Sequence, residues 1–200
     1  MVPGLLPFHV AGPSGYTGPV TEPTSEALRE SLKRVAVSLK EIGRPYALTG
    51  GYAAWALGAP ENAHDVDFLV HPDDVDAIVE RLRERGFEIE HPPEDWLVKV
   101  RTDGVLVDLL HRTNGFDVAD GLARAETLNV LSVDMAVLSA TDLVSEKLLA
   151  LDEHYCDLSA VLPTLRALRE KVDWDVVGKR STGAPFAEAT LFLLERLDVI

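Results

Sequence analysis

Hydrophobic residues recur at helical or strand spacing along most of the chain, and the pattern predicts a mixed order of helices and strands. A helical period begins after Thr24 and ends at Gly43, and a second apolar stripe runs from Pro72 to Gly86. Short apolar runs predict strands over 45–48, 66–70, 87–91, 96–102, 105–110 and 127–133. A short helix over 52–57 is expected after a break at Gly50-Gly51.

The last third of the chain follows a helical period almost throughout. Helices are expected from Ser139 or Thr141 to about 151, over 157–171 with a split or kink at Pro163, and over 184–197. The first 23 residues are so rich in proline and glycine that an irregular arm is expected there. The pattern therefore predicts an arm over 1–23, an α/β core over 24–135 and a helical segment over 136–200.

The charge and cysteine content restrict the class of protein. The chain of 200 residues has 19 Lys and Arg against 33 Asp and Glu, a net charge of −14. Such a charge repels phosphate backbones and argues against general nucleic-acid binding, although a local basic patch remains compatible with it. A single cysteine excludes an intrachain disulfide, and no apolar run is long enough to span a bilayer. We therefore expect a cytoplasmic protein with no membrane segment.

Three polar motifs interrupt the apolar pattern. Thr49-Gly50-Gly51 follows the first strand, Asp65-Val66-Asp67 begins the second, and Asp108 lies inside the strand over 105–110. Each motif alone has a simpler interpretation: a Gly-Gly pair is commonly a turn, and Asp-x-Asp is commonly a solvated strand edge. An inward-facing Asp108 can also be paired with an arginine such as Arg101 or Arg112.

Together the three motifs predict a site for a metal and a phosphate. Residues i and i+2 of a strand point to one face, so Asp65 and Asp67 present adjacent carboxylates that repel unless a cation such as Mg²⁺ lies between them. If the strand of Asp108 is a neighbour, the three acids form a cage for one or two Mg²⁺ ions and a nucleoside triphosphate. Gly50 and Gly51 allow the backbone to approach the phosphates closely.

The order of these motifs resembles the polymerase-beta-type nucleotidyltransferase superfamily, in which a Gly-Gly or Gly-Ser turn precedes an Asp-x-Asp pair and a third acid. Within it, the chain looks most like the minimal AbiEii-type and MenT-type proteins, many of which are toxins of bacterial toxin–antitoxin pairs. Residues 138–151 resemble their Ser/Thr-x-x-Asp-Leu segment and the helix that follows, and Lys147 and Asp157 match functional positions there. The resemblance covers about residues 25–170.

The resemblance implies an α+β nucleotidyltransferase fold, with a short mixed sheet, flanking helices and a C-terminal helical segment. It assigns metal binding and catalysis to Asp65, Asp67 and Asp108. It makes Lys147 a catalytic residue that contacts the triphosphate, and Asp157 a residue that holds Lys147 or the helices in place. The remaining substrate-binding positions are Thr49, Gly50, Gly51 and His64.

One segment departs from the family pattern. The families carry Arg and Ser or Thr just before the Asp pair, whereas this chain has Glu61-Asn62-Ala63-His64. His64 or Asn62 is then the expected replacement for the lost phosphate contacts. The departure leaves open a nucleotide-binding module without catalytic activity.

The resemblance further implies transfer of NMP from an NTP to an acceptor hydroxyl, with a tRNA 3′ end as acceptor and an antitoxin as protein partner. The candidate basic surface for the RNA is formed by Arg81, Arg83, Arg85, Lys99 and Arg101, although such charges are more commonly only a solvated face. The alternative acceptor is a cationic small molecule, as in aminoglycoside- and lincosamide-modifying enzymes. The net charge of −14 fits that alternative better than it fits RNA.

Overall fold

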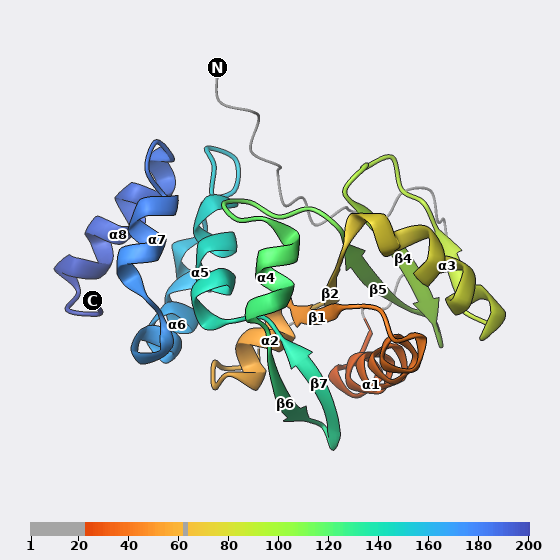
Figure 1. Cartoon of the computed structure of the whole chain (residues 1–200). Coiled ribbons are helices and arrows are strands. Elements are labelled where there is room, and N and C mark those ends of the chain that lie inside the picture. The colour runs from red at the N-terminus through yellow and green to blue at the C-terminus, as the bar shows by residue number, and fades with distance from the viewer. Residues whose placement is uncertain (1–22, 62–63) are drawn as a thin grey trace.

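The computed structural model describes residues 23–61 and 64–200, where eight α-helices accompany one seven-stranded mixed sheet (Figure 1). The strands are β1 (Tyr46–Thr49), β2 (Val66–Val70), β3 (Glu88–Glu90), β4 (Leu97–Thr102), β5 (Val105–Leu110), β6 (Glu126–Val130) and β7 (Val133–Val137). The helices are α1 (Ser25–Ile42), α2 (Gly50–Ala56), α3 (Val75–Glu84), α4 (Val118–Arg124), α5 (Ala140–Leu149), α6 (Leu158–Leu168), α7 (Trp174–Arg180) and α8 (Pro185–Arg196). Two 3₁₀ turns, Pro72–Asp74 and Arg169–Lys171, complete the elements. The expected arm lies outside the described residues except for Pro23.

The sheet has the strand order β3-β4-β5-β2-β1-β7-β6. Strand β2 pairs with β5 in parallel and β1 pairs with β7 in parallel, while the other neighbours are antiparallel. All five residues of β2 are buried, as expected for a central strand that is covered on both faces. This mixed α/β architecture with a helical C-terminal segment confirms the expected fold class.

Helix α1 forms where the sequence predicts it and covers the sheet. Thr24 caps its first turn by accepting a hydrogen bond from the backbone of Ala27, and Gly43 ends it in the left-handed conformation. Its apolar stripe, centred on Leu32 and Val35, packs against β1, β2, β5 and β7. Helix α3 packs beside it, and Figure 1 shows the two helices on the same side of the molecule, away from the C-terminal helices.

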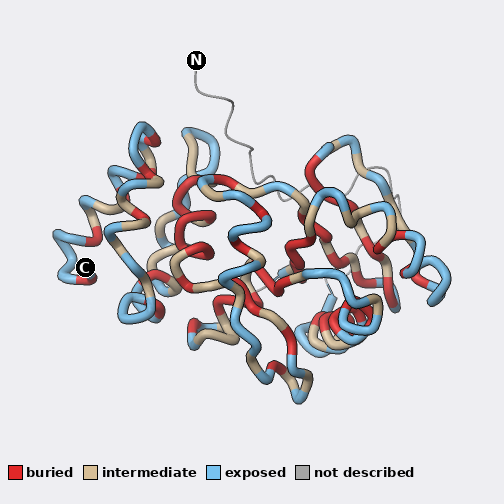
Figure 2. The backbone as a smooth tube through the Cα atoms, in the orientation of Figure 1, coloured by how far each residue is buried: buried red, intermediate tan, exposed pale blue. Residues whose placement is uncertain are grey.

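Two apolar clusters stabilise the described part of the chain. The first joins the sheet to α1 and α3, and the second joins α2 to helices α5–α8 around Val144, Leu148 and Leu165. Figure 2 shows buried backbone concentrated in the sheet and in α5, which lies between the sheet and the outer helices. Among the described helices, none is long and apolar enough to cross a membrane.

Four elements differ from the expected ones. The single strand predicted over 127–133 is a hairpin of β6 and β7, because Leu131 and Ser132 form the turn with positive φ angles, without glycine or proline to mark it. Helices α4 and α7 occupy segments for which no helix was predicted. Both are only seven residues long, too short to show a clear helical period, and Asp117 and Asp173 cap them. Pro163 lies inside α6 without ending it.

Candidate functional site

Four neighbouring strands place one polar residue each in a row across the sheet. Thr49 of β1 lies opposite Asp67 of β2, Asp67 opposite Asp108 of β5, and Asp108 opposite Lys99 of β4. Residues that lie opposite each other in a sheet point to the same face, so the four side chains share one face. The structure thus brings Asp67 and Asp108 together, as expected from the sequence.

Asp67 is the buried centre of this row, with an exposed fraction of 6%. Burial and the nearby carboxylates of Asp65 and Asp108 raise the pKa of Asp67 well above its usual range. Asp65 is half-buried and precedes the first residue of β2. Neither Asp65 nor Asp67 forms an ion pair with another described residue. The pair therefore concentrates negative charge that the described chain does not neutralise directly.

Lys147, on α5, lies near this charge. It lies close enough to lower the pKa of Asp67, although burial and the two carboxylates outweigh its effect. Its side chain is half-buried and makes no hydrogen bond or ion pair within the described part of the chain. Lys147 is thus placed with its charge available to a ligand of the Asp67 site.

Lys99 is the member of the row that the sequence placed on a basic surface instead. Its Nζ donates hydrogen bonds to both carboxylate oxygens of Asp108 at 3.0 Å, and both side chains are 17% exposed. Burial raises the pKa of Asp108, and Lys99 opposes this rise. The hairpin turn contained the missed signal: Asp103-Gly104 makes Thr102 pair with Val105, and moving three residues away from the turn along each strand pairs Lys99 with Asp108.

The prediction that Lys99 belongs to a basic surface is therefore wrong. The other residues predicted for that surface are largely neutralised by neighbouring side chains. Arg101 donates to Glu90 and Arg81 to Glu84, while Arg85 pairs with Glu41. Arg83 lies 3.2 Å from a ring nitrogen of His91. The arginines proposed as partners of Asp108 are engaged elsewhere too, since Arg112 donates to Asp95.

The Gly-Gly turn is part of the site because only glycine fits at its first position. Gly50 has a φ of +65°, and a Cβ at that position would lie 1.9 Å from Oδ2 of Asp67. The turn does not separate β1 from a later helix, as predicted, because Gly50 and Gly51 are themselves the first residues of α2. Thr49, the preceding residue, is buried in the row.

The departure at residues 61–64 has a visible structural consequence. Glu61 forms a bidentate ion pair with Arg29 of α1, in which Nε donates to Oε1 at 2.9 Å, and the hydroxyl of Tyr52 donates to the same oxygen at 3.5 Å. Glu61 therefore ties the segment before the Asp pair to α1 and α2. His64 is exposed next to Asp65, and residues 62 and 63 lie outside the described part of the chain.

Asp157 lies apart from the carboxylate row. It is exposed and caps α6, accepting hydrogen bonds from the backbone of Ser159 and Ala160 and from the hydroxyl of Ser159. These bonds lower its pKa. Within the described residues Asp157 forms no ion pair with Lys147, and the contact that the structure shows for it is the cap of α6.

The donor set fits a hard divalent cation. Asp67 is a buried carboxylate whose negative charge is destabilised by two other carboxylates, and a cation such as Mg²⁺ relieves that repulsion. Across residues 23–61 and 64–200, however, no three His, Cys, Asp or Glu side chains are arranged to enclose an ion. Asp65 and Asp67 are the residues that would hold the ion.

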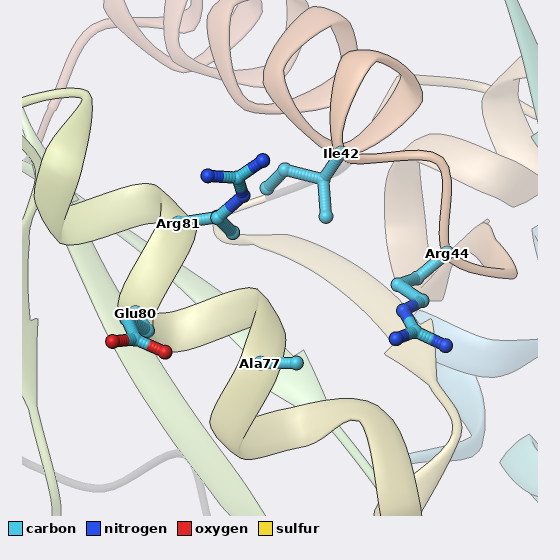
Figure 3. A pocket seen from close by; sticks show the side chains of 5 residues that line it. All are labelled: Ile42, Arg44, Ala77, Glu80 and Arg81. Atoms are coloured by element: carbon cyan, nitrogen blue, oxygen red, sulfur yellow. The ribbon is translucent and has the colours of Figure 1, made fainter.

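A hollow of about 230 Å³ lies elsewhere, between the end of α1 and α3 (Figure 3). It is lined by Ile42, Arg44, Ala77, Glu80 and Arg81. None of the row residues lines this hollow, and its arginine and glutamate side chains spread along the rim in Figure 3 without converging on one point. The negative charge that would attract a ligand therefore lies at the carboxylate row and not at this hollow.

Solved structures share this fold. The chain is similar to ANT(2")-Ia in complex with adenylyl-2"-tobramycin (TM-score 0.57, 11% identity, 80% of this chain and 97% of the other). It is also similar to the solution structure of the antibiotic-resistance factor ANT(2'')-Ia (TM-score 0.58, 12% identity, 83% and 96%). An antigenic nucleotidyltransferase-like protein from Paracoccidioides brasiliensis matches less well (TM-score 0.49, 20% identity, 70% and 76%). No curated protein has a significant sequence match.

A family model extends the likeness from the fold to the sequence. It covers residues 21–199, which include the row across the sheet, the Gly-Gly turn, Lys147 and all eight described α-helices. With the match spanning nearly the whole chain, this protein belongs to the enzyme family described as "Uncharacterised nucleotidyltransferase".

Proposed function

We propose that this nucleotidyltransferase uses Mg²⁺ to transfer NMP from an NTP to an acceptor hydroxyl, with release of pyrophosphate. The observation that carries the proposal is the row in which Asp67 lies opposite Asp108, with Asp65 and Lys147 close enough to shift the pKa of Asp67. Nucleotidyl transfer requires chiefly that the triphosphate be held in place and its charge neutralised. Two acids for a cation and one lysine for phosphate meet that requirement.

Each residue then has a defined task. Bound to Asp65 and Asp67, Mg²⁺ supplies charge neutralisation at the triphosphate. Lys147, which has no ion pair among the described residues, contacts the triphosphate, and the turn at Thr49-Gly50-Gly51 borders it. The acceptor oxygen attacks the α-phosphorus while the bond to pyrophosphate breaks. Asp108, opposite Asp67, accepts the proton that the acceptor hydroxyl loses.

The acceptor that the family resemblance supports is an RNA, specifically a tRNA 3′ end, which makes the protein a cytoplasmic toxin with a cognate antitoxin. The Ser139-x-x-Asp142 segment supports this AbiEii/MenT-like assignment, because its serine caps the helix that carries Lys147. His64 is exposed beside Asp65, where it is available to phosphate in place of the arginine of the related families.

A second acceptor, a hydroxyl-bearing cationic small molecule, is supported by the charge around the site. Glu94 lies near enough to Asp108 to raise its pKa, which adds a further negative charge near Asp108. Arg81, Arg85 and Arg101, which a tRNA would need, are paired with acids. ANT(2")-Ia, which shares the fold, is solved with adenylyl-2"-tobramycin. These observations favour the cationic acceptor on electrostatic grounds.

The test incubates the protein with each α-³²P-labelled NTP and Mg²⁺, in parallel with total tRNA and with a panel of aminoglycosides. Label on tRNA supports the toxin assignment, and label on an aminoglycoside supports the second acceptor. The Asp67→Asn variant is the control and is expected to lose all transfer. Calorimetry with NTP and Mg²⁺ completes the test: binding without transfer to any acceptor indicates a nucleotide-binding module, and no binding overturns the proposal.

A further inference from the structure

Asp108 differs from the other two acids of the site in having its own cation. Lys99 donates to Oδ1 and Oδ2 of Asp108 at 3.0 Å each, so one ammonium group engages both oxygens of the carboxylate. Asp65 and Asp67 have no ion pair with a described residue. The three acids expected to form one cage are therefore divided into a neutralised member and an anionic pair.

The pairing is built into the sheet. Lys99 and Asp108 lie directly opposite each other on antiparallel strands joined by a two-residue turn. Each side chain is only 17% exposed, so water screens their attraction poorly and the lysine has little room to leave. A metal ion bound to Asp108 would have to displace this ammonium or lie beside it, and the two cations would repel each other.

We propose that Lys99 is a permanent counter-ion of Asp108, and that the site therefore binds one divalent cation, on Asp65 and Asp67, in place of two. The inference rests on the proposed function, because it concerns the metal of that same site. A single divalent ion matches the two carboxylates that remain without a partner. Lys99 is thereby a positioning residue: it holds Asp108 in place for the acceptor and keeps it out of metal coordination.

The arrangement of the acids agrees with this division. No three acidic, histidine or cysteine side chains among the described residues are placed to enclose one ion, although Asp67 and Asp108 lie on adjacent strands in register. Lys147 is a second cation near Asp67, and it faces the charge without an ion pair in the described chain. With lysines at Asp108 and at Asp67, a second divalent ion would add charge that the site no longer needs to offset.

The experiment is a titration of the full-length protein with Mn²⁺ alone, with free Mn²⁺ measured by electron paramagnetic resonance. The wild type is expected to bind one Mn²⁺ at the site, and Asp67→Asn none. The charge-neutral double variant Lys99→Met/Asp108→Asn is the decisive one. It should still bind one Mn²⁺, with a Kd changed by less than about tenfold, which is below the loss expected when a metal ligand is removed.

Two single variants separate a charge effect from a structural one. Lys99→Met exposes Asp108 to the metal and should bind a second Mn²⁺, whereas Lys99→Arg keeps a cation there and should bind one. A thermal melt by circular dichroism confirms that each variant is folded. The double variant removes both charges as a pair, so it leaves no buried charge unpaired and keeps the inference testable if Lys99→Met fails to fold.

The outcomes distinguish this inference from the proposed function. Two Mn²⁺ on the wild type, or a loss of affinity above about tenfold in the double variant, makes Asp108 a metal ligand and overturns the inference while the proposed function stands. An absence of Mn²⁺ binding in the wild type, or binding that Asp67→Asn leaves unchanged, removes the metal from the proposed site. That result contradicts the proposed function itself.

Discussion

Two buried carboxylates of this protein, Asp67 and Asp142, have opposite surroundings. Asp142, on α5, has a side chain that is 0% exposed and is surrounded by donors. Arg124 donates from Nε and Nη2 at 3.0 Å each, Arg180 from Nη1 at 2.8 Å and Ser139 from its hydroxyl at 2.8 Å. Asp67, which is 6% exposed, has no ion pair with a described residue and lies among other acids.

The contrast separates a carboxylate that its own chain neutralises from one that has no ion pair among the described residues. Asp142 links three helices, because Arg124 belongs to α4 and Arg180 to α7, and the ring of Phe116 lies 5.6 Å and 5.1 Å from their guanidinium carbons. A buried charge that its own chain satisfies stabilises the packing of those helices. A buried carboxylate that has no cationic partner and lies beside other carboxylates is repelled by them, and a bound cation reduces that repulsion. Burial alone therefore does not mark a candidate ligand site. A buried charge without an ion-pair partner does.

The largest effect is expected at Asp142. Asp142→Ala leaves Arg180, whose side chain is 16% exposed, without its anion, and should lower the free energy of unfolding by about 3–5 kcal/mol. Urea denaturation followed by circular dichroism measures it. The exposed cap Asp157 is the matched control, because Asp157→Ala removes a carboxylate from a helix cap and should cost much less. Equal losses in the two variants would contradict the structural role of Asp142.

Glu146, one turn further along α5, is an intermediate case. It is buried, accepts a hydrogen bond from the backbone of Asn114 at 2.6 Å, and burial raises its pKa from 4.5 to about 8. The folded protein therefore holds this proton more tightly than the unfolded chain does, and stability is lost as the pH rises from 4.5 to about 8. In the wild type this loss in the free energy of unfolding is on the order of 4 kcal/mol, and Glu146→Gln should remove it.

Unfolding of the wild type and of Glu146→Gln is compared at intervals between pH 4 and pH 9. The two proteins should be about equally stable at the acid end, where Glu146 is protonated in both the folded and the unfolded state. The variant should be the more stable one at the alkaline end. Parallel stability curves across this range would show that Glu146 does not titrate within its buried environment.

Gly50 tests the close approach between the turn and Asp67. Gly50→Ala brings a Cβ to 1.9 Å from Oδ2 of Asp67 and keeps a residue at φ +65°, so the carboxylate must move. We expect a cost of about 2 kcal/mol in stability together with weaker Mn²⁺ binding. Gly43→Ala is the control: its φ is +74°, but a Cβ there meets nothing within 4 Å. Gly43→Ala should lose stability because of its positive φ angle, while its affinity for Mn²⁺ stays unchanged.

A gain in stability, in place of a loss, is expected at Asp67. The pKa of Asp67 is raised, so its ionisation above the usual aspartate range destabilises the metal-free folded state. Asp67→Asn should therefore be more stable than the wild type at pH 7 without divalent ions, and the gain should vanish near pH 3, where Asp67 is protonated in both the folded and the unfolded state. Differential scanning calorimetry measures this, and a variant less stable than wild type at pH 7 would contradict the assignment.

Asp108→Asn sharpens the comparison between the acids of the row. Burial raises the pKa of Asp108 although Lys99 opposes the rise, so Asp108→Asn should also stabilise the metal-free protein at pH 7, but less than Asp67→Asn does, because Lys99 loses its partner. The same calorimetric measurement gives both gains, and an equal or larger gain in Asp108→Asn would contradict the role of Lys99.

Much of the fold could be predicted because the relevant signals are local. Thr24 and Gly43 mark the ends of α1, Asp103-Gly104 sets the β4–β5 hairpin, and the apolar run over 66–70 is a central strand. Helices α4 and α7 were missed because seven residues span only two turns, and the β6–β7 turn was missed because Leu131 and Ser132 carry no turn signal. Tertiary packing stabilises these elements where propensity does not.

The sequence by itself identified the candidate site, because carboxylates at i and i+2, a Gly-Gly turn and a later acid follow one another along the chain in the order that metal and phosphate binding require. Only the tertiary structure decided which charged side chains lie next to each other. Strand pairing placed Lys99 on Asp108, so a residue expected on a basic surface lies inside the site. Helix packing placed two arginines on Asp142 and gave Asp67 no ion pair among the described residues. The physical reason is that charge compensation acts through space at a few ångströms, between residues that sequence separation does not relate.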